Sequence, residues 1–202
     1  MIYLFAALPT AGKTTLARQL ESTHDAVRFT LDERMINKYE FTIFDDEYGP
    51  LAAQEKDLIW QEAQVLLNQG QSVSLDWSLW SQKARQEWIS KIEGAGYTYK
   101  LFYLDVPLST IKDRLTIRNT QTDELPVFAI PYEEIVRFSK IFQPPTADEN
   151  LNLIHMRPTA ENPWLATRSR TGAEYDAPYE DRAANGEDIY GEANLVQQLL
   201  QT

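Results

Sequence analysis

The chain has 202 residues, no cysteine, 43% hydrophobic residues and a formal net charge of −11. This length accommodates one α/β domain with an appendage, and the lack of cysteine excludes disulfide bonds and thiolate metal sites. The excess of acidic residues argues against non-specific binding of nucleic acid, because most of such a surface repels a phosphate polymer.

A segment near the N-terminus has the pattern of a phosphate-binding loop. The apolar run at residues 2–6 predicts a buried strand, and a helical pattern follows the loop. Gly12 permits close approach of the backbone, Lys13 supplies a charge for the β- and γ-phosphates, and the Thr14 hydroxyl can ligate Mg²⁺. We therefore expect ATP to be bound by Ala7, Pro9, Thr10, Ala11, Gly12, Lys13, Thr14 and Thr15.

Ala7 is the one departure from the pattern G-x-x-x-x-G-K-[ST]. It stands where the first glycine is expected, and alanine takes a positive φ only at a cost. The alternative interpretation of the whole segment is a turn that matches the motif by chance.

The N-terminal residues enter the first strand directly, with neither a basic segment nor a cleavage site, so we expect no signal peptide. The longest apolar runs are strand-sized, far below the roughly 20 residues of a membrane span. Both features predict a cytoplasmic protein with no membrane partner.

Short β-rich apolar runs predict four further strands, at residues 27–31, 72–76, 99–104 and 150–154. Helical patterns lie between strands at residues 51–69 and 81–93. Strands that alternate with helices indicate right-handed βαβ units, and therefore an α/β fold with a mainly parallel sheet.

The composition changes after Met156, where we expect the core domain of residues 1–156 to end. Residues 157–185 contain three prolines, many charges and few aliphatic side chains, which is typical of an extended or partly disordered arm. A short helix at 194–200 is expected to end this C-terminal arm of residues 157–202. Its aromatic side chains could pack over the nucleotide cleft, mediate self-association or simply cover the domain.

Asp32 directly follows the second predicted strand. Ligands of open α/β sheets bind at the carboxyl ends of strands, so this carboxylate is expected near the γ-phosphate of a nucleotide bound at the first strand. It is our candidate for the general base that orients an acceptor hydroxyl. The alternative is a helix N-cap.

Asp76 ends the third predicted strand, where a Walker B carboxylate would hold Mg²⁺ through water. Thr14 and Asp76 are thus the predicted metal-binding residues. Two alternatives for Asp76 are a cap on the turn into residues 77–80 and a base role shared or exchanged with Asp32.

Arg114 and Arg118 are four residues apart in a helical segment, so they share one face of that helix. Two guanidinium groups on one face can clamp phosphate oxygens as charge develops. The neighbouring Asp113 favours the alternative, a solvated face. Arg34 and Arg85 are weaker candidates for contacts with the acceptor or the phosphates.

Residues 39–48 mix aromatic and acidic side chains and could build an acceptor pocket. Trp77 and Trp80 could line the same pocket or belong to the core. The acids at residues 45–47 would favour a cationic substrate or form a solvated loop.

Together these motifs resemble the AAA_33 group of P-loop kinase-like ATPases, which is similar to polynucleotide 5′-kinases, zeta-type toxins, chloramphenicol phosphotransferase and gluconate kinase. The resemblance covers residues 1 to about 155. Its motifs are the loop at 7–15, Leu-Asp-Glu-Arg at 31–34, Leu-Asp-Trp-Ser-Leu-Trp at 75–80, Tyr-Leu-Asp-Val-Pro-Leu at 103–108, Arg-x-x-x-Arg-Asn at 114–119 and Phe-Gln-Pro-Pro-x-x-Asp-Glu at 142–149.

The resemblance implies an NMP-kinase-like three-layer sandwich with a five-stranded parallel sheet of order 2-3-1-4-5. It also implies a lid at about residues 108–125 that carries Arg114 and Arg118, and it gives Asp32 the role of activating the acceptor hydroxyl. Many relatives have the spacing Asp-x-x-Arg after the second strand, whereas Arg34 is one residue closer to its aspartate.

These features predict an ATP- and Mg²⁺-dependent kinase that phosphorylates a hydroxyl of a small molecule, with Lys13, Asp32, Arg114 and Arg118 as catalytic residues. The alternatives within the class are a polynucleotide 5′-hydroxyl kinase, whose substrate is a nucleic-acid end, and a zeta-like toxin kinase. An alternative of another class is a nucleotide-dependent regulatory protein that only hydrolyses ATP. Acceptors differ widely within the group, so the resemblance sets the donor and leaves the acceptor open.

Overall fold

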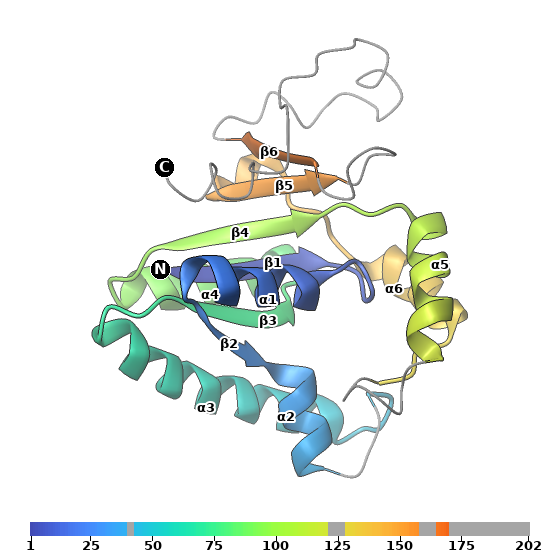
Figure 1. Ribbon diagram of the computed structural model, residues 1–202, viewed down its shortest axis with the longest axis horizontal. Coiled ribbons are helices and arrows are strands. Elements are labelled where there is room, and N and C mark those ends of the chain that lie inside the picture. The colour runs from blue at the N-terminus through green and yellow to red at the C-terminus, as the bar shows by residue number, and fades with distance from the viewer. Residues whose placement is uncertain (40–42, 121–127, 158–164, 170–202) are drawn as a thin grey trace.

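The computed structural model describes residues 1–39, 43–120, 128–157 and 165–169. Its centre is a six-stranded sheet of order β2-β3-β1-β4-β5-β6. The strands are β1 (Ile2–Ala7), β2 (Val27–Thr30), β3 (Val73–Ser78), β4 (Tyr99–Leu104), β5 (Leu153–Arg157) and β6 (Leu165–Ser169). The first five are parallel, which confirms the predicted α/β fold and the predicted strand order (Figure 1).

Helices cover both faces of this sheet and make the three layers (Figure 1). They are α1 (Lys13–His24), α2 (Leu31–Lys38), α3 (Tyr48–Asn68), α4 (Gln82–Gly94), α5 (Leu108–Asn119) and α6 (Tyr132–Ile141), with a 3₁₀ turn, η1, at Ala147–Glu149. All six residues of β1 are buried because side chains on both faces of a covered parallel sheet are removed from water.

The alternation of β1 side chains separates two hydrophobic clusters. Leu4 packs with α2, α3 and α4 on one face, whereas Phe5 packs with α1, α5 and α6 on the other. The first two helices, α1 and α2, thus lie on opposite faces of the sheet.

Of the five predicted strands, only β4 has the predicted boundaries. β1 extends one residue further, to Ala7, and β3 spans Val73–Ser78 instead of 72–76. β2 stops at Thr30 because Leu31 already begins α2. β5 starts only at Leu153, because residues 147–149 form η1 and Asn150 leaves it in a left-handed conformation with φ 50°.

The sixth strand corrects the predicted end of the core at Met156. β6 comes from the segment expected to be an arm and pairs antiparallel with β5, from Leu153 opposite Ser169 to Arg157 opposite Leu165. The predicted terminal helix at 194–200 lies outside the described residues, as does the part of the predicted lid beyond residue 120. Within the described part of the chain, no helix combines the length and apolarity needed to cross a membrane.

Candidate active site

The loop after β1 has the backbone shape of an anion site. Thr10 and Gly12 both take left-handed conformations, with φ 59° and φ 107°, and α1 begins directly at Lys13. A left-handed conformation at a non-glycine residue such as Thr10 costs about 1–2 kcal/mol. Backbone strain of this kind is typical of functional loops. The first turn of α1 contains no acidic residue, which leaves its free N–H groups and the positive end of its dipole available to an anion.

Ala7 fits the first position of the loop without strain. It is the last residue of β1, and the non-glycine residues with positive φ in the described chain are Thr10, Asp25 and Asn150. Its N–H donates to Ser78 Oγ at 3.0 Å, and the Ser78 hydroxyl donates to the Ala7 carbonyl at 2.7 Å. The strand end that carries the loop is thus held by β3, so a glycine is not needed there.

Lys13 lies among the acids that the sequence singled out. Burial lowers the pKa of the Lys13 ammonium, while Asp76 and Asp32 raise it. These three groups therefore meet at the carboxyl ends of β1, β2 and β3, as predicted from the topology.

Asp76 is deeply buried, with 4% of its surface exposed. It lies within β3, which continues to Ser78, so the predicted cap on a following turn is wrong. The neighbouring Thr14 hydroxyl lowers the pKa of the Asp76 carboxyl, yet burial dominates and raises it. Its Oδ2 atom has no hydrogen bond within the described residues; the nearest cation is Arg28, with Nη1 at 3.6 Å.

Asp32 lies in the first turn of α2. The N-cap position of this helix belongs to Thr30, so the predicted N-cap role of Asp32 is wrong. Burial raises the pKa of the Asp32 carboxyl, and Lys13, Arg118 and Lys56 act in the opposite direction. A carboxylate that is partly buried beside several cations can both hold a negative charge and accept a proton near neutral pH.

The two arginines of α5 reach the site. Arg114 Nη1 donates to the carbonyl of Ala11, inside the loop, at 3.0 Å. Arg118 acts on both Lys13 and Asp32, and its Nη2 donates to the Phe128 carbonyl at 3.3 Å. Asp113 is exposed. Arg114 and Arg118 thus lie toward the loop and Asp32, and α5 stands at the carboxyl end of the sheet (Figure 1).

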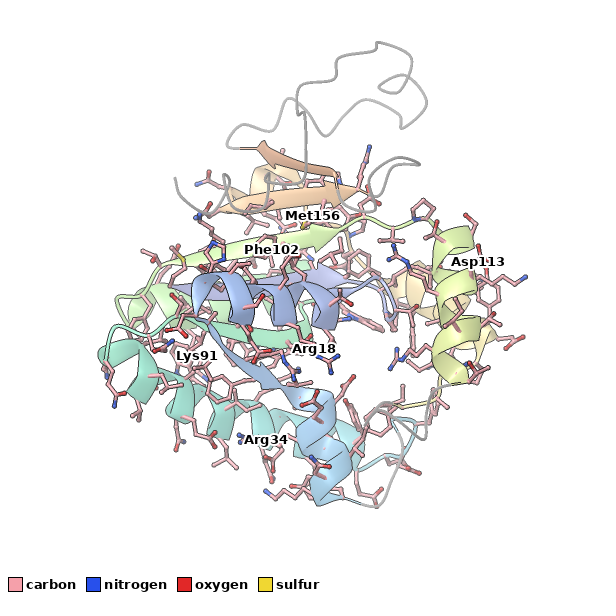
Figure 2. All side chains as sticks on the ribbon, viewed as in Figure 1. Arg18, Arg34, Lys91, Phe102, Asp113 and Met156 are labelled. Atoms are coloured by element: carbon pink, nitrogen blue, oxygen red, sulfur yellow. The ribbon has the colours of Figure 1, made fainter. Side chains whose placement is uncertain are left out.

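Arg34 does not belong to this group. In Figure 2 it lies beside α3, where it donates to Glu62 at 2.9 and 2.6 Å. Two residues apart on a helix means about 200° around its axis, so Asp32 and Arg34 point to different sides of α2. The predicted acceptor or phosphate contact of Arg34 is therefore wrong.

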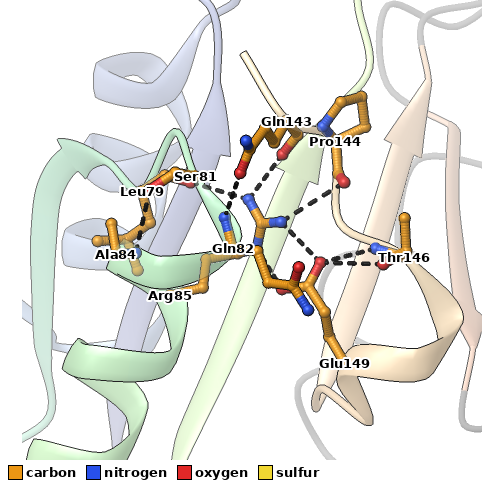
Figure 3. A network of polar contacts seen from close by, with 9 residues as sticks. All are labelled: Leu79, Ser81, Gln82, Ala84, Arg85, Gln143, Pro144, Thr146 and Glu149. Carbon is orange, nitrogen blue, oxygen red and sulfur yellow. Dashed lines mark hydrogen bonds and ion pairs between the residues drawn. The ribbon is translucent and has the colours of Figure 1, made fainter. Parts of the chain in front are cut away.

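Arg85 is also not a ligand-binding residue. It is fully buried and donates to both Glu149 carboxylate oxygens, at 2.7 and 2.6 Å. The remaining donors reach the carbonyls of Leu79, Gln143 and Pro144, as Figure 3 shows. This network joins the loop after β3 to the segment between α6 and β5, so Arg85 has a structural role.

We expect Arg85→Met to lower the free energy of unfolding by about 3–5 kcal/mol, because it leaves the buried Glu149 carboxylate without its partner. Chemical denaturation measures the effect as a lower midpoint with an unchanged slope. Lys83→Met is the matched control on the same helix, since Lys83 forms an exposed pair with Glu87 and exposed pairs contribute little. An Arg85→Met variant as stable as that control would contradict the assignment.

Two residues near Asp32 were not identified as individual candidates from the sequence. Lys56 comes from α3, and its burial lowers the pKa of its ammonium while Asp32 raises it. Tyr48, at the start of α3, lies edge-on to Phe128 with 5.9 Å between ring centroids. Burial, and then Asp32, raise the pKa of its phenol well above the usual value. Tyr48 belongs to the run that the sequence assigned to an acceptor pocket; residues 40–42 of that run lie outside the described residues.

Trp77 and Trp80 take different places. Trp77 is buried and packs against Trp88 with 5.1 Å between ring centroids, so the core alternative holds for it. Trp80 contacts Phe138 of α6.

This fold and loop define a P-loop kinase-like protein. Residues 4–145 match the family model of the AAA domain AAA_33. The chain therefore belongs to the AAA_33 family. No curated protein matches it significantly.

Solved structures share the fold at low sequence identity. The Mycobacterium tuberculosis APS kinase CysC, in complex with AMPPNP and APS, superposes with a TM-score of 0.55 at 16% identity over 100% of this chain and 97% of its own. A sugar kinase from Janibacter sp. HTCC2649 gives a TM-score of 0.51 at 14% identity over 77% of this chain and 84% of its own. A chain of the Pnkp1/Rnl/Hen1 RNA repair complex gives 0.56 at 19% identity over 69% of this chain. The match spans only 42% of that longer chain.

Proposed function

We propose that this protein is an ATP-dependent kinase that transfers the γ-phosphoryl group to a hydroxyl of a small molecule. The observation that carries the proposal is the position of Asp32, a partly buried carboxylate that acts on Lys13 and Arg118 beside the phosphate-binding loop. A protein that only binds nucleotide needs the loop, whereas phosphoryl transfer also needs a group that orients the acceptor.

The proposed reaction assigns one task to each residue. The loop N–H groups and Lys13 bind the β- and γ-phosphates, and Arg114 and Arg118 stabilise the charge on the transferred group. The acceptor oxygen forms a bond to the γ-phosphorus while the bond from that phosphorus to the β–γ bridging oxygen breaks. Asp32 takes the proton of the acceptor hydroxyl, and ADP leaves.

Thr14 and Asp76 fit a bound Mg²⁺. The Asp76 Oδ2 atom is buried without a hydrogen bond from the described residues, and a hydroxyl beside a carboxylate is the oxygen donor set that Mg²⁺ takes together with phosphates. When bound, Mg²⁺ would neutralise phosphate charge. The fold of a kinase whose structure contains AMPPNP supports the use of a nucleotide.

Transfer from γ-labelled ATP to a panel of sugars, nucleosides, aminoglycosides, nucleotide sugars and oligonucleotides tests the proposal. Labelled product in at least one arm, absent with Lys13→Ala, is the expected result. Release of labelled phosphate to water alone, whatever the acceptor, would favour a regulatory protein that only hydrolyses ATP.

A polynucleotide 5′-hydroxyl kinase is the second candidate, supported by the likeness to a chain of an RNA repair complex. Binding to a nucleic-acid end would weaken steeply as salt rises, because phosphate contacts release counterions. The net charge of −11 makes a small acceptor the better expectation.

The pH dependence of the reaction follows from the pKa of Asp32. Burial raises that pKa, so the base keeps its proton to a higher pH than an ordinary aspartate. In the pH profile of kcat/KM, the acid limb, where the rate falls as the base becomes protonated, should therefore lie at a pH above the usual carboxyl pKa. The charged or titratable groups that face Asp32 are Lys13, Arg118, Lys56, Glu33, Tyr48 and Asp76.

Lys56 lowers the pKa of Asp32, so Lys56→Met should move this limb to higher pH. Lys91→Met is the control, because Lys91 pairs with Asp57 on the outer surface, and it should leave the limb in place. A limb that moves to lower pH in Lys56→Met would contradict the assignment of Asp32 as the base.

A further inference from the structure

Lys56 reaches the site from the face of the sheet opposite to the phosphate-binding loop. It is carried by α3, which packs on the Leu4 face, while Lys13 begins α1 on the Phe5 face. Its ammonium lies over the ring of Trp77, 5.8 Å from the ring centroid. The carboxylate of Asp32 acts on both lysines, so Lys56 faces Asp32 from the side that the loop does not occupy.

The Lys56 ammonium has no hydrogen bond or ion pair with any residue that the structure describes. Other lysines of the same helix layer do have such partners. Lys38 pairs with Glu55, and Lys91, which also lies over tryptophan rings, pairs with Asp57 at 2.7 Å. A partly buried cation without a hydrogen-bonded anion is unfavourable by itself, and a ligand anion would remove that cost.

ATP does not supply this anion in the proposed reaction. The phosphates are bound from the α1 side by Lys13 and from α5 by Arg114 and Arg118. Asp32, which receives the acceptor hydroxyl, lies toward Lys56 on the remaining side. The anion that Lys56 binds is therefore expected on the acceptor.

We propose that Lys56 is a specificity-determining residue and that the acceptor is an alcohol with a carboxylate or phosphate group close to the hydroxyl that is phosphorylated. This inference rests on the proposed kinase function. The ammonium of Lys56 forms a charge-assisted hydrogen bond with that group, and the Trp77 ring below it keeps the cation in place. The exposed acids at residues 45–47 do not oppose such a ligand, because charges in water are screened.

Matched pairs of neutral and anionic alcohols test the proposal with the full chain. The pairs are glycerol and glycerate, glycerol and glycerol phosphate, glucose and gluconate, and adenosine and adenosine 3′-monophosphate. Initial rates of transfer from γ-labelled ATP give kcat and KM for each. The anionic member is expected to be the better acceptor, and the carboxylate and phosphate arms identify which anion the site takes.

Lys56→Met should lower kcat/KM for the anionic acceptor by about 10- to 100-fold, mainly through KM, because a hydrogen bond to a charged group is lost. At a pH above the acid limb, where the change in the pKa of Asp32 has no effect on the rate, the neutral partner should change by less than about twofold, and Lys56→Arg should restore most of the loss. Lys91→Met is the matched control: it removes another cation over tryptophan rings, on the side of the molecule opposite to α5 (Figure 2), and should change neither acceptor.

The outcomes separate this inference from the function on which it rests. No transfer to any acceptor by the unmodified chain would contradict the kinase function itself. Transfer with equal preference for neutral and anionic partners, or a preference that Lys56→Met leaves intact, would overturn the role of Lys56 while the kinase function stands.

Discussion

Asp32→Asn is expected to abolish phosphoryl transfer while ATP binding stays within about threefold of the unmodified chain. The amide keeps the shape of the carboxylate but accepts no proton from the acceptor hydroxyl, and general-base catalysis contributes about 10²–10⁴ in rate. Asp32 contacts the nucleotide in no step before transfer, so the affinity for ATP should survive. Single-turnover rates and calorimetric titration with ATP measure the two quantities separately.

Asp113→Asn is the control for this change, since Asp113 is an exposed aspartate on α5. It should transfer at the normal rate. The parallel variant Asp76→Asn distinguishes the two acids. If Asp76→Asn loses transfer and an excess of Mg²⁺ partly restores it, Asp76 binds the metal. Full transfer in Asp32→Asn with none in Asp76→Asn would exchange their roles.

Lys13→Ala is expected to reduce kcat/KM for ATP by at least about 100-fold and to weaken nucleotide binding by about 10- to 100-fold. The ammonium provides a charge-assisted contact to the phosphates, worth about 1.5–3 kcal/mol in binding, and stabilises charge that develops in the transition state. Its loss also removes a cation that lowers the pKa of Asp32. The base would then stay protonated to higher pH, which adds to the loss of rate.

Loss of folding should not explain this result. Lys13 is a partly buried cation in the free protein, and its removal leaves Asp32 and Asp76 free to take up a proton, because burial already raises the pKa of both carboxyls. The midpoint of denaturation of Lys13→Ala should equal or exceed that of the unmodified chain, and Lys83→Ala, an exposed change, should alter neither binding nor stability. Unchanged turnover in Lys13→Ala would exclude the loop from the reaction.

The parts of the molecule that the sequence predicted correctly depend on short stretches of chain. The loop at residues 7–15 combines strand end, turn and helix start in one local pattern, so its geometry follows from neighbouring residues. The strand order came from the resemblance, and the topology then placed Asp32 and Asp76 near Lys13, because parallel strands end at the same edge.

The errors at Arg34 and Arg85 concern contacts between residues that are distant in sequence. Arg34 pairs with Glu62 across 28 residues and Arg85 with Glu149 across 64, and neither partner leaves a signal in the local pattern. A lysine within a helical pattern, such as Lys56, is normally solvated, so its approach to Asp32 depends on the packing of α2 against α3. β6 has few apolar residues and follows two prolines, and an antiparallel edge strand needs no continuous apolar run.

Calorimetric titration of the full chain with a non-hydrolysable ATP analogue and Mg²⁺ tests the central claim most directly, namely that the turn between β1 and α1 binds a triphosphate. The expected result is a saturable heat with one site per chain, which disappears in Lys13→Ala. No heat in the unmodified chain, or the same heat in Lys13→Ala, would contradict the account.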